Sequence, residues 1–239
     1  MKSRILIFIF SLVVGIVNAQ PKGVWDYPVK PGTEEWKQFK SYAEKVAACQ
    51  IPEELLSSLS TEDLTELCLR YPLYTDFLKL ENISDGLDRL FSNFNGIREL
   101  YRREDVSSSL NRRYTEKIRS LSFLDGENSD FQKGLFIINV SILEVLFSRI
   151  ELQNSEDKEA PKAVLQSLVA GWEEKMKYPK IFQGLFTTNY YARARIISKL
   201  DETFIERLPD KDENMVFITG MVDGQTFSLI HEMSFQLIE

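Results

Sequence analysis

Residues 130–153 read DFQKGLFIINVSILEVLFSRIELQ and give the strongest indication of how this chain folds. If this segment is helical, apolar side chains fall on nearly every face of the helix. Such a helix belongs inside a core rather than at a surface. The β-branched residues would also suit a strand, but the length of the segment favours a helix. We therefore predict a buried central helix over 130–153, with Phe136 and Leu143 in the core.

Helical patterns continue on both sides of this segment. Before it, helices are predicted over 33–49 and 106–124, and after it over 161–177 and 187–208. Pro161 suits the first turn of its helix, where the missing N–H has no partner to lose.

A pattern of short helices precedes these longer ones. Pro52-Glu53-Glu54-Leu55 and Thr61-Glu62-Asp63-Leu64 each place a helix-starting residue before two carboxylates and a leucine, and Ser60 is the expected N-cap of the second helix. Tyr71-Pro72 should end it. Further short helices are expected over 73–80, from Ser84 onward and over 97–103. Short helices joined by tight turns favour a helical-repeat-like array or an orthogonal bundle.

The C-terminal region has a different pattern. Met215–Thr219 and Thr226–Ile230 are rich in β-branched and aromatic residues, and Asp223-Gly224 between them is a turn signal. This pattern predicts a β-hairpin over about 214–231, packed on the helices. Phe235–Ile238 is a candidate third strand. The predicted fold is therefore mainly α, with a small C-terminal β-hairpin.

The first residues have the features of a signal peptide. Met1–Arg4 are basic, the apolar run from Ile5 to Val17 is too short to span a bilayer comfortably, and Val17-Asn18-Ala19 resembles a cleavage site. We predict cleavage before Gln20, an extended lead-in over 20–32 and a single domain over 33–239. The mature chain is expected to be exported, periplasmic or secreted, without a lipid anchor because no cysteine lies near the cut.

Charge and hydropathy limit the partners. The formal net charge is −7, and it becomes −9 once Lys2 and Arg4 leave with the signal peptide. An acidic chain of this kind argues against nucleic acid as a partner. No later segment approaches the length of apolar sequence that a membrane span needs, so none is expected in the mature chain. An unidentified protein or a glycan is the expected partner.

Several residues are candidates for chemistry. Arg98, Arg102, Arg103, Arg112 and Arg113 belong to a basic stretch, with Lys117 and Arg119, that could bind an anionic sugar, phosphate or carboxylate. Pairing with Glu99, Glu104, Asp105 and Glu116 on the same helices is the favoured alternative. Cys49 and Cys68 could form a disulfide, permitted outside the cytoplasm, or remain buried thiols.

Other motifs are weak. His231, the only histidine, has no neighbours with metal-ligand spacing and is expected at a surface or hairpin edge. The segment 210–221 begins like a calcium loop but lacks the required Gly and Glu. No motif for a metal or cofactor is present, so none is expected. Aromatic residues between Trp172 and Tyr191 could stack on a glycan, but more often such residues form a core.

One segment resembles a known group of proteins. Cys49–Leu56, Ser60–Leu64 and Cys68–Leu73 together resemble a stretch in uncharacterised exported helical proteins of gut-dwelling bacteria, over about a third of the chain. The resemblance implies export and a helical fold, and it brings no catalytic residues. The leading functional hypothesis is a non-enzymatic binding or protein-interaction module. The alternative is an extracytoplasmic hydrolase that uses a pair of carboxylates, for example on glycans.

Overall fold

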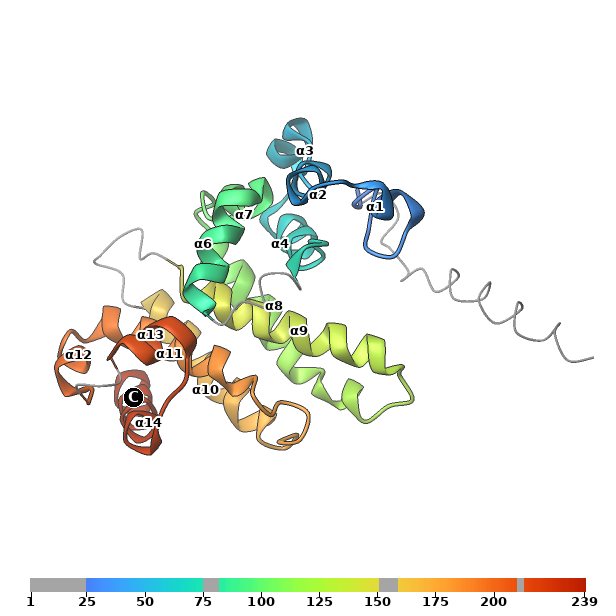
Figure 1. Ribbon diagram of the computed structural model, residues 1–239. Helices are drawn as coiled ribbons and strands as arrows, with labels where there is room; N and C mark the ends of the chain where they lie inside the picture. The colour runs from blue at the N-terminus through green and yellow to red at the C-terminus, as the bar shows by residue number, and fades with distance from the viewer. Residues whose placement is uncertain (1–24, 75–81, 151–158, 210–212) are drawn as a thin grey trace, which may run out of the picture.

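The computed structural model describes residues 25–74, 82–150, 159–209 and 213–239, and these residues form helices joined by short loops (Figure 1). No strand occurs in these ranges. The helices are α1 (Glu34–Gln38), α2 (Tyr42–Ala48), α3 (Glu53–Ser58), α4 (Thr61–Leu69), α6 (Ile83–Asn93), α7 (Asn95–Leu100), α8 (Val106–Arg119), α9 (Asp130–Phe147), α10 (Glu159–Lys175), α11 (Phe186–Leu200), α12 (Thr203–Arg207), α13 (Glu213–Thr219) and α14 (Gly224–Ile238), with a 3-10 turn η2 (Leu121–Leu124). The prediction of a mainly helical chain is confirmed.

Four longer helices make the centre of the molecule. Helix α9 packs on α8 and α11, and α10 packs on the same two helices from the other side. The short helix α4 joins this centre through α7 and α8, while α14 covers α10 and α11. Figure 1 shows α1–α4 on one side of α8 and α9 and α12–α14 on the other.

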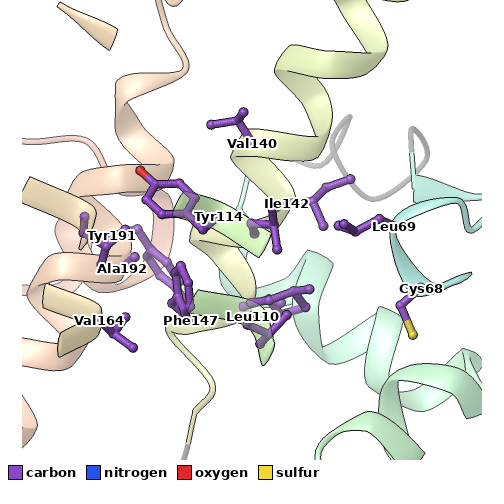
Figure 2. Packing of buried hydrophobic residues seen from close by; sticks show 14 of the residues in the cluster. Cys68, Leu69, Leu110, Tyr114, Val140, Ile142, Phe147, Val164, Tyr191 and Ala192 are labelled. Carbon is purple, nitrogen blue, oxygen red and sulfur yellow. The ribbon is translucent and has the colours of Figure 1, made fainter. Parts of the chain in front are cut away.

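Helix α9 is buried mainly over its C-terminal half, and Phe136 before it is also buried, as predicted. Leu143 and Phe147 are fully buried, whereas Phe131 is 75% exposed and Leu135 41% exposed. Figure 2 shows α9 between Val164, Tyr191 and Ala192 of α10 and α11 on one side and Cys68 and Leu69 of α4 on the other. The predicted central helix is therefore present, but its first turns extend past the helices that would cover it.

This uneven burial predicts different effects for two truncations on one helix. Leu143→Ala should lower the free energy of unfolding by about 2–5 kcal/mol because it leaves a cavity in the core. Phe131→Ala should change it by no more than about 0.5 kcal/mol, since most of that ring is already in water. Urea denaturation of both variants tests this. Equal losses would show that the start of α9 is covered in solution.

The short helices follow their predicted caps. The Ser60 hydroxyl accepts a hydrogen bond from the Asp63 amide and begins α4, and α3 begins after Pro52. The single helix expected over 33–49 is instead two helices. Phe39 ends α1 in an extended conformation, and the Ser41 hydroxyl caps α2 by accepting from the Glu44 amide. Residues 75–80 of the helix expected over 73–80 lie outside the described part of the chain.

The predicted C-terminal hairpin over 214–231 is wrong. Helices α13 and α14 occupy this region, and Phe235–Ile238, the candidate third strand, is part of α14. Asp223, read as a turn signal, is the N-cap of α14, and its carboxylate accepts from the Thr226 amide at 2.7 Å.

Burial explains why the region is helical. Thr226, Ile230, Met233 and Ser234 are buried, and their spacing is that of one helix face rather than of alternate strand positions. Tertiary packing of this face on α10 and α11 outweighs the β propensity of the residues around it.

Candidate functional site

The residues of the predicted arginine site lie in α7, in the turn after it and in α8. Arg98 donates to main-chain carbonyls at the end of α6. Arg102 and Arg103 both approach the Glu99 carboxylate, at 3.8 and 2.8 Å. Arg103 also donates to the main-chain oxygen of Leu56 at 2.7 Å. This arginine therefore fastens α7 to α3.

The other two arginines of this prediction lie on α8 and face α4. Arg112 is paired with Glu62, and Arg113 with both Glu66 and Glu116. All five arginines are thus engaged with carboxylates or main-chain carbonyl groups, some nearby in sequence and some on neighbouring helices. The structure does not gather them into one cluster, and their role in ligand binding stays a prediction.

The two cysteines are free thiols in the structure and both are buried. They lie near Tyr27, whose hydroxyl donates to the main-chain oxygen of Leu67 at 3.0 Å and holds the lead-in against α4. Burial raises the pKa of Cys49 to about 11 and raises that of Cys68 well above its usual range. Thiolates are therefore scarce at neutral pH, and a thiolate is the form that reacts.

This burial predicts slow thiol chemistry in the native protein. At pH 8 the folded chain should react only slowly with a thiol reagent. The chain unfolded in guanidinium should react rapidly at both cysteines. A colorimetric thiol assay with and without denaturant measures this. A chain that shows no thiol even when unfolded, without reductant, would instead contain the disulfide.

The single histidine lies on α14 among aromatic rings. The His231 ring is 5.1 Å from Trp172, 5.7 Å from Phe227 and 4.8 Å from Phe235, between ring centroids. Burial and the nearby Arg193 guanidinium lower the pKa of His231. Because α14 replaces the expected hairpin, this histidine is a packing residue between helices and not a hairpin-edge residue.

The aromatic residues between Trp172 and Tyr191, which more often form a core than a glycan surface, are divided here between the two. Phe182 and Tyr191 are buried. Trp172 and Tyr190 are half-buried and joined by a hydrogen bond of 3.3 Å from the indole N–H to the phenol oxygen. These residues mostly hold α10, α11 and α14 together. Tyr178 instead lines an open groove, which is described below.

A buried ion pair lies at the centre of the four long helices. The Lys175 ammonium is 2.9 and 2.8 Å from the two oxygens of Glu144, and both side chains are fully buried. The same carboxylate accepts from Tyr114 Oη at 2.8 Å, Thr188 Oγ1 at 2.6 Å and Asn189 Nδ2 at 3.0 Å. Each of the helices α8, α9, α10 and α11 supplies at least one member.

Sequence reasoning missed this ion pair, although one signal was present. Glu144 is the only charged residue between Lys133 and Arg149, in an otherwise apolar and small-residue segment. A charge there needs a buried partner. Because no solvent reaches the pair, its role is to orient helices rather than to act on a ligand.

The described surface contains an open groove between α8, η2 and α10. Its volume is about 680 Å³, within the range of roughly 300–1,000 Å³ that is usual for ligand sites. Ala170 of α10 is exposed and lines the groove. The lining consists of Thr115, Ile118, Arg119, Leu121, Ser122, Gln166, Ser167, Ala170, Glu174, Lys177 and Tyr178.

Five polar side chains in this groove make no side-chain hydrogen bond or ion pair within the described structure. Within the described ranges, no side-chain hydrogen bond or ion pair involves Thr115, Arg119, Ser122, Gln166 or Ser167. Elsewhere, helical hydroxyls such as those of Thr65 and Ser92 donate to a carbonyl four residues earlier. The groove therefore offers hydroxyl, amide and guanidinium groups that a ligand can engage.

The remaining polar groups of the groove are engaged. The Glu174 carboxylate pairs with Lys177 at 2.6 Å, and Tyr178 donates to the Asp125 carboxylate at 2.7 Å. That hydrogen bond raises the pKa of the Tyr178 hydroxyl, so the phenol stays protonated and its ring is held in one orientation. Arg119 is then the charged residue of the groove without an ionic partner in the described part of the chain.

Comparisons with known proteins and a search for metal-ligand clusters do not assign a function to the site. The chain matches no protein family, no curated protein and no solved structure. Among the residues with a described placement, no group of three or more His, Cys, Asp or Glu side chains could hold a metal ion. No described helix is both long enough and apolar enough to cross a membrane.

Proposed function

We propose that the protein is an exported, non-enzymatic binding module that holds its ligand in the groove between α8 and α10. One observation carries the proposal: five uncommitted polar side chains line an open groove with an apolar floor. Ligand sites typically combine such a floor with a few polar groups that fix orientation. Unused polar groups on both walls allow several hydrogen bonds to form at once.

The carboxylates near the groove support binding over hydrolysis. A glycoside hydrolase of the usual kind needs two carboxyl groups, one protonated, on either side of the bond to be broken. Glu174 is the carboxylate among the lining residues, and its charge is paired with Lys177. Asp125 lies beside Tyr178 and accepts its phenol hydrogen bond. Both acids therefore already have a partner in the fold.

Export rests on the first residues, which lie outside the described part of the chain. The basic flank, the short apolar run and the Val17-Asn18-Ala19 site support it. N-terminal sequencing of the protein recovered outside the cytoplasm should start at Gln20. Recovery of material that still carries Lys2 would contradict cleavage, and recovery only from cytosol would contradict export.

A pair of variants on one helix tests the groove. Ala170→Trp fills it, whereas Ala163→Trp places the same ring on an exposed position of α10 that does not line it. In a thermal-shift screen of oligosaccharides, peptides and organic acids, at least one class should stabilise the wild type and Ala163→Trp but not Ala170→Trp. A ligand that stabilises all three equally would place binding elsewhere.

The enzyme alternative needs a separate measurement. Any compound that binds should be recovered intact after long incubation with the protein. Turnover that disappears in Glu174→Gln, with the fold retained, would overturn the non-enzymatic proposal in favour of a hydrolase.

A further inference from the structure

We infer that the groove between α8 and α10 binds a short acidic glycan, with a uronate-type carboxylate at Arg119 and sugar hydroxyls on the polar walls. The inference rests on the proposed function and names the ligand class of the same site. Charge, hydrogen-bonding groups and shape each support it.

Charge points to an anionic ligand. Glu174 and Lys177 neutralise each other at 2.6 Å, and Glu116, one helical turn before Arg119, is already engaged with Arg113 at 3.0 Å. Among the lining residues, Arg119 therefore leaves an excess of one positive charge, in a chain whose net charge is −7. The nearby Asp125 carboxylate lies outside the lining and accepts the hydrogen bond of Tyr178. A guanidinium matches a planar carboxylate with two parallel hydrogen bonds.

The uncharged polar groups suit sugar hydroxyls. Thr115 and Ser122 lie on one wall, and Gln166 and Ser167 on the other. Each of these groups can both donate and accept a hydrogen bond, which is also true of every hydroxyl of a sugar. A ligand with hydroxyls on both edges could therefore engage the two walls together.

The floor suits the less polar face of a sugar ring. Ile118, Leu121 and Ala170 are apolar, and the Tyr178 ring is held by its bond to Asp125. Aromatic and aliphatic groups of this kind pack on the C–H face of a pyranose.

A peptide ligand fits this groove less well. A peptide that binds by strand addition needs a sheet edge, and no strand exists among the described residues. Helical peptides need a mainly apolar groove for their anchors, whereas this groove combines apolar residues with polar and charged ones. The mixed lining favours the glycan.

Titration calorimetry with defined oligomers tests the inference. The probes are trigalacturonate, an alginate trimer and a hyaluronan tetrasaccharide, with neutral galactotriose and tri-glutamate for comparison. At least one uronate oligomer should bind, and galactotriose should bind more weakly. Arg119→Gln should weaken the uronate complex by about tenfold to a hundredfold, the range for a lost charge-assisted hydrogen bond, and leave galactotriose unaffected.

The matched control is Arg112→Gln on the same helix. Arg112 is paired with Glu62 and does not line the groove, so this variant should bind like the wild type. The inference is overturned if no uronate oligomer binds, if binding survives Arg119→Gln, or if tri-glutamate binds as tightly. In one outcome, no uronate oligomer binds, but another ligand binds the wild type and not Ala170→Trp. The acidic-glycan inference then fails, whereas the proposed binding function stands.

Discussion

Lys175→Met should lower the free energy of unfolding by about 3–5 kcal/mol, because removal of one partner leaves a buried charge uncompensated. Glu144 would keep hydrogen bonds from Tyr114, Thr188 and Asn189 but lose its only ionic partner. For a chain of this size, such a loss lowers the melting temperature by roughly 10 °C. Thermal and urea denaturation of the variant measure it.

Two further variants separate charge from packing. Lys177→Met, two residues later, removes a lysine that is 63% exposed and should cost no more than about 1 kcal/mol. Glu144→Gln added to Lys175→Met removes the unpaired charge but keeps an oxygen that can accept from Tyr114. The double variant should be more stable than Lys175→Met alone. If it is not, the loss arises from packing rather than from the buried charge.

Gly171→Ala should lower the free energy of unfolding by about 2–4 kcal/mol, the sum expected for overpacking and for the loss of a buried hydrogen bond. An added Cβ would lie 2.0 Å from the Tyr114 hydroxyl oxygen and 2.7 Å from the ring carbon that bears it. Tyr114 is fully buried, so either its ring leaves Glu144 or α8 and α10 move apart. Thermal denaturation tests the change.

Gly134→Ala on α9 is the control for this substitution. Its added Cβ would meet no atom within 4 Å, so the higher helix propensity of alanine should stabilise the protein by about 0.5–1 kcal/mol. Similar effects of the two substitutions would show that α8 and α10 do not approach closely at Gly171.

Local signals predicted the helices well, because caps and periodicity act over a few residues. Ser60 begins α4 and Pro161 lies in the first turn of α10, as expected. The same local reasoning gave a wrong hairpin, because Asp223-Gly224 serves equally as a turn and as the start of a helix. Only the packing of Ile230 and Met233 on other helices decides between these two structures.

The groove could not be predicted from the sequence. Arg119 belongs to the basic stretch and Tyr178 to the aromatic group, but nothing in the sequence indicates that they line the same groove. Their helices meet because Gly171 allows Tyr114 to approach α10 closely. The groups available for a ligand are those that lack a partner, and partners are visible only in three dimensions.

The arrangement around Glu144 also limits the order in which the helices can assemble. Its partners Tyr114 and Lys175 are 30 and 31 residues away along the chain, and Asn189 is 45 residues away. A chain emerging from its N-terminus therefore completes α8 and α9 well before Lys175 or Asn189 exists. If α9 docks on α8 at that stage, the Glu144 carboxylate has the Tyr114 hydrogen bond but not yet its counterion. The ion pair can thus form only once α10 has been made, and the full set of Glu144 hydrogen bonds only once α11 has been made.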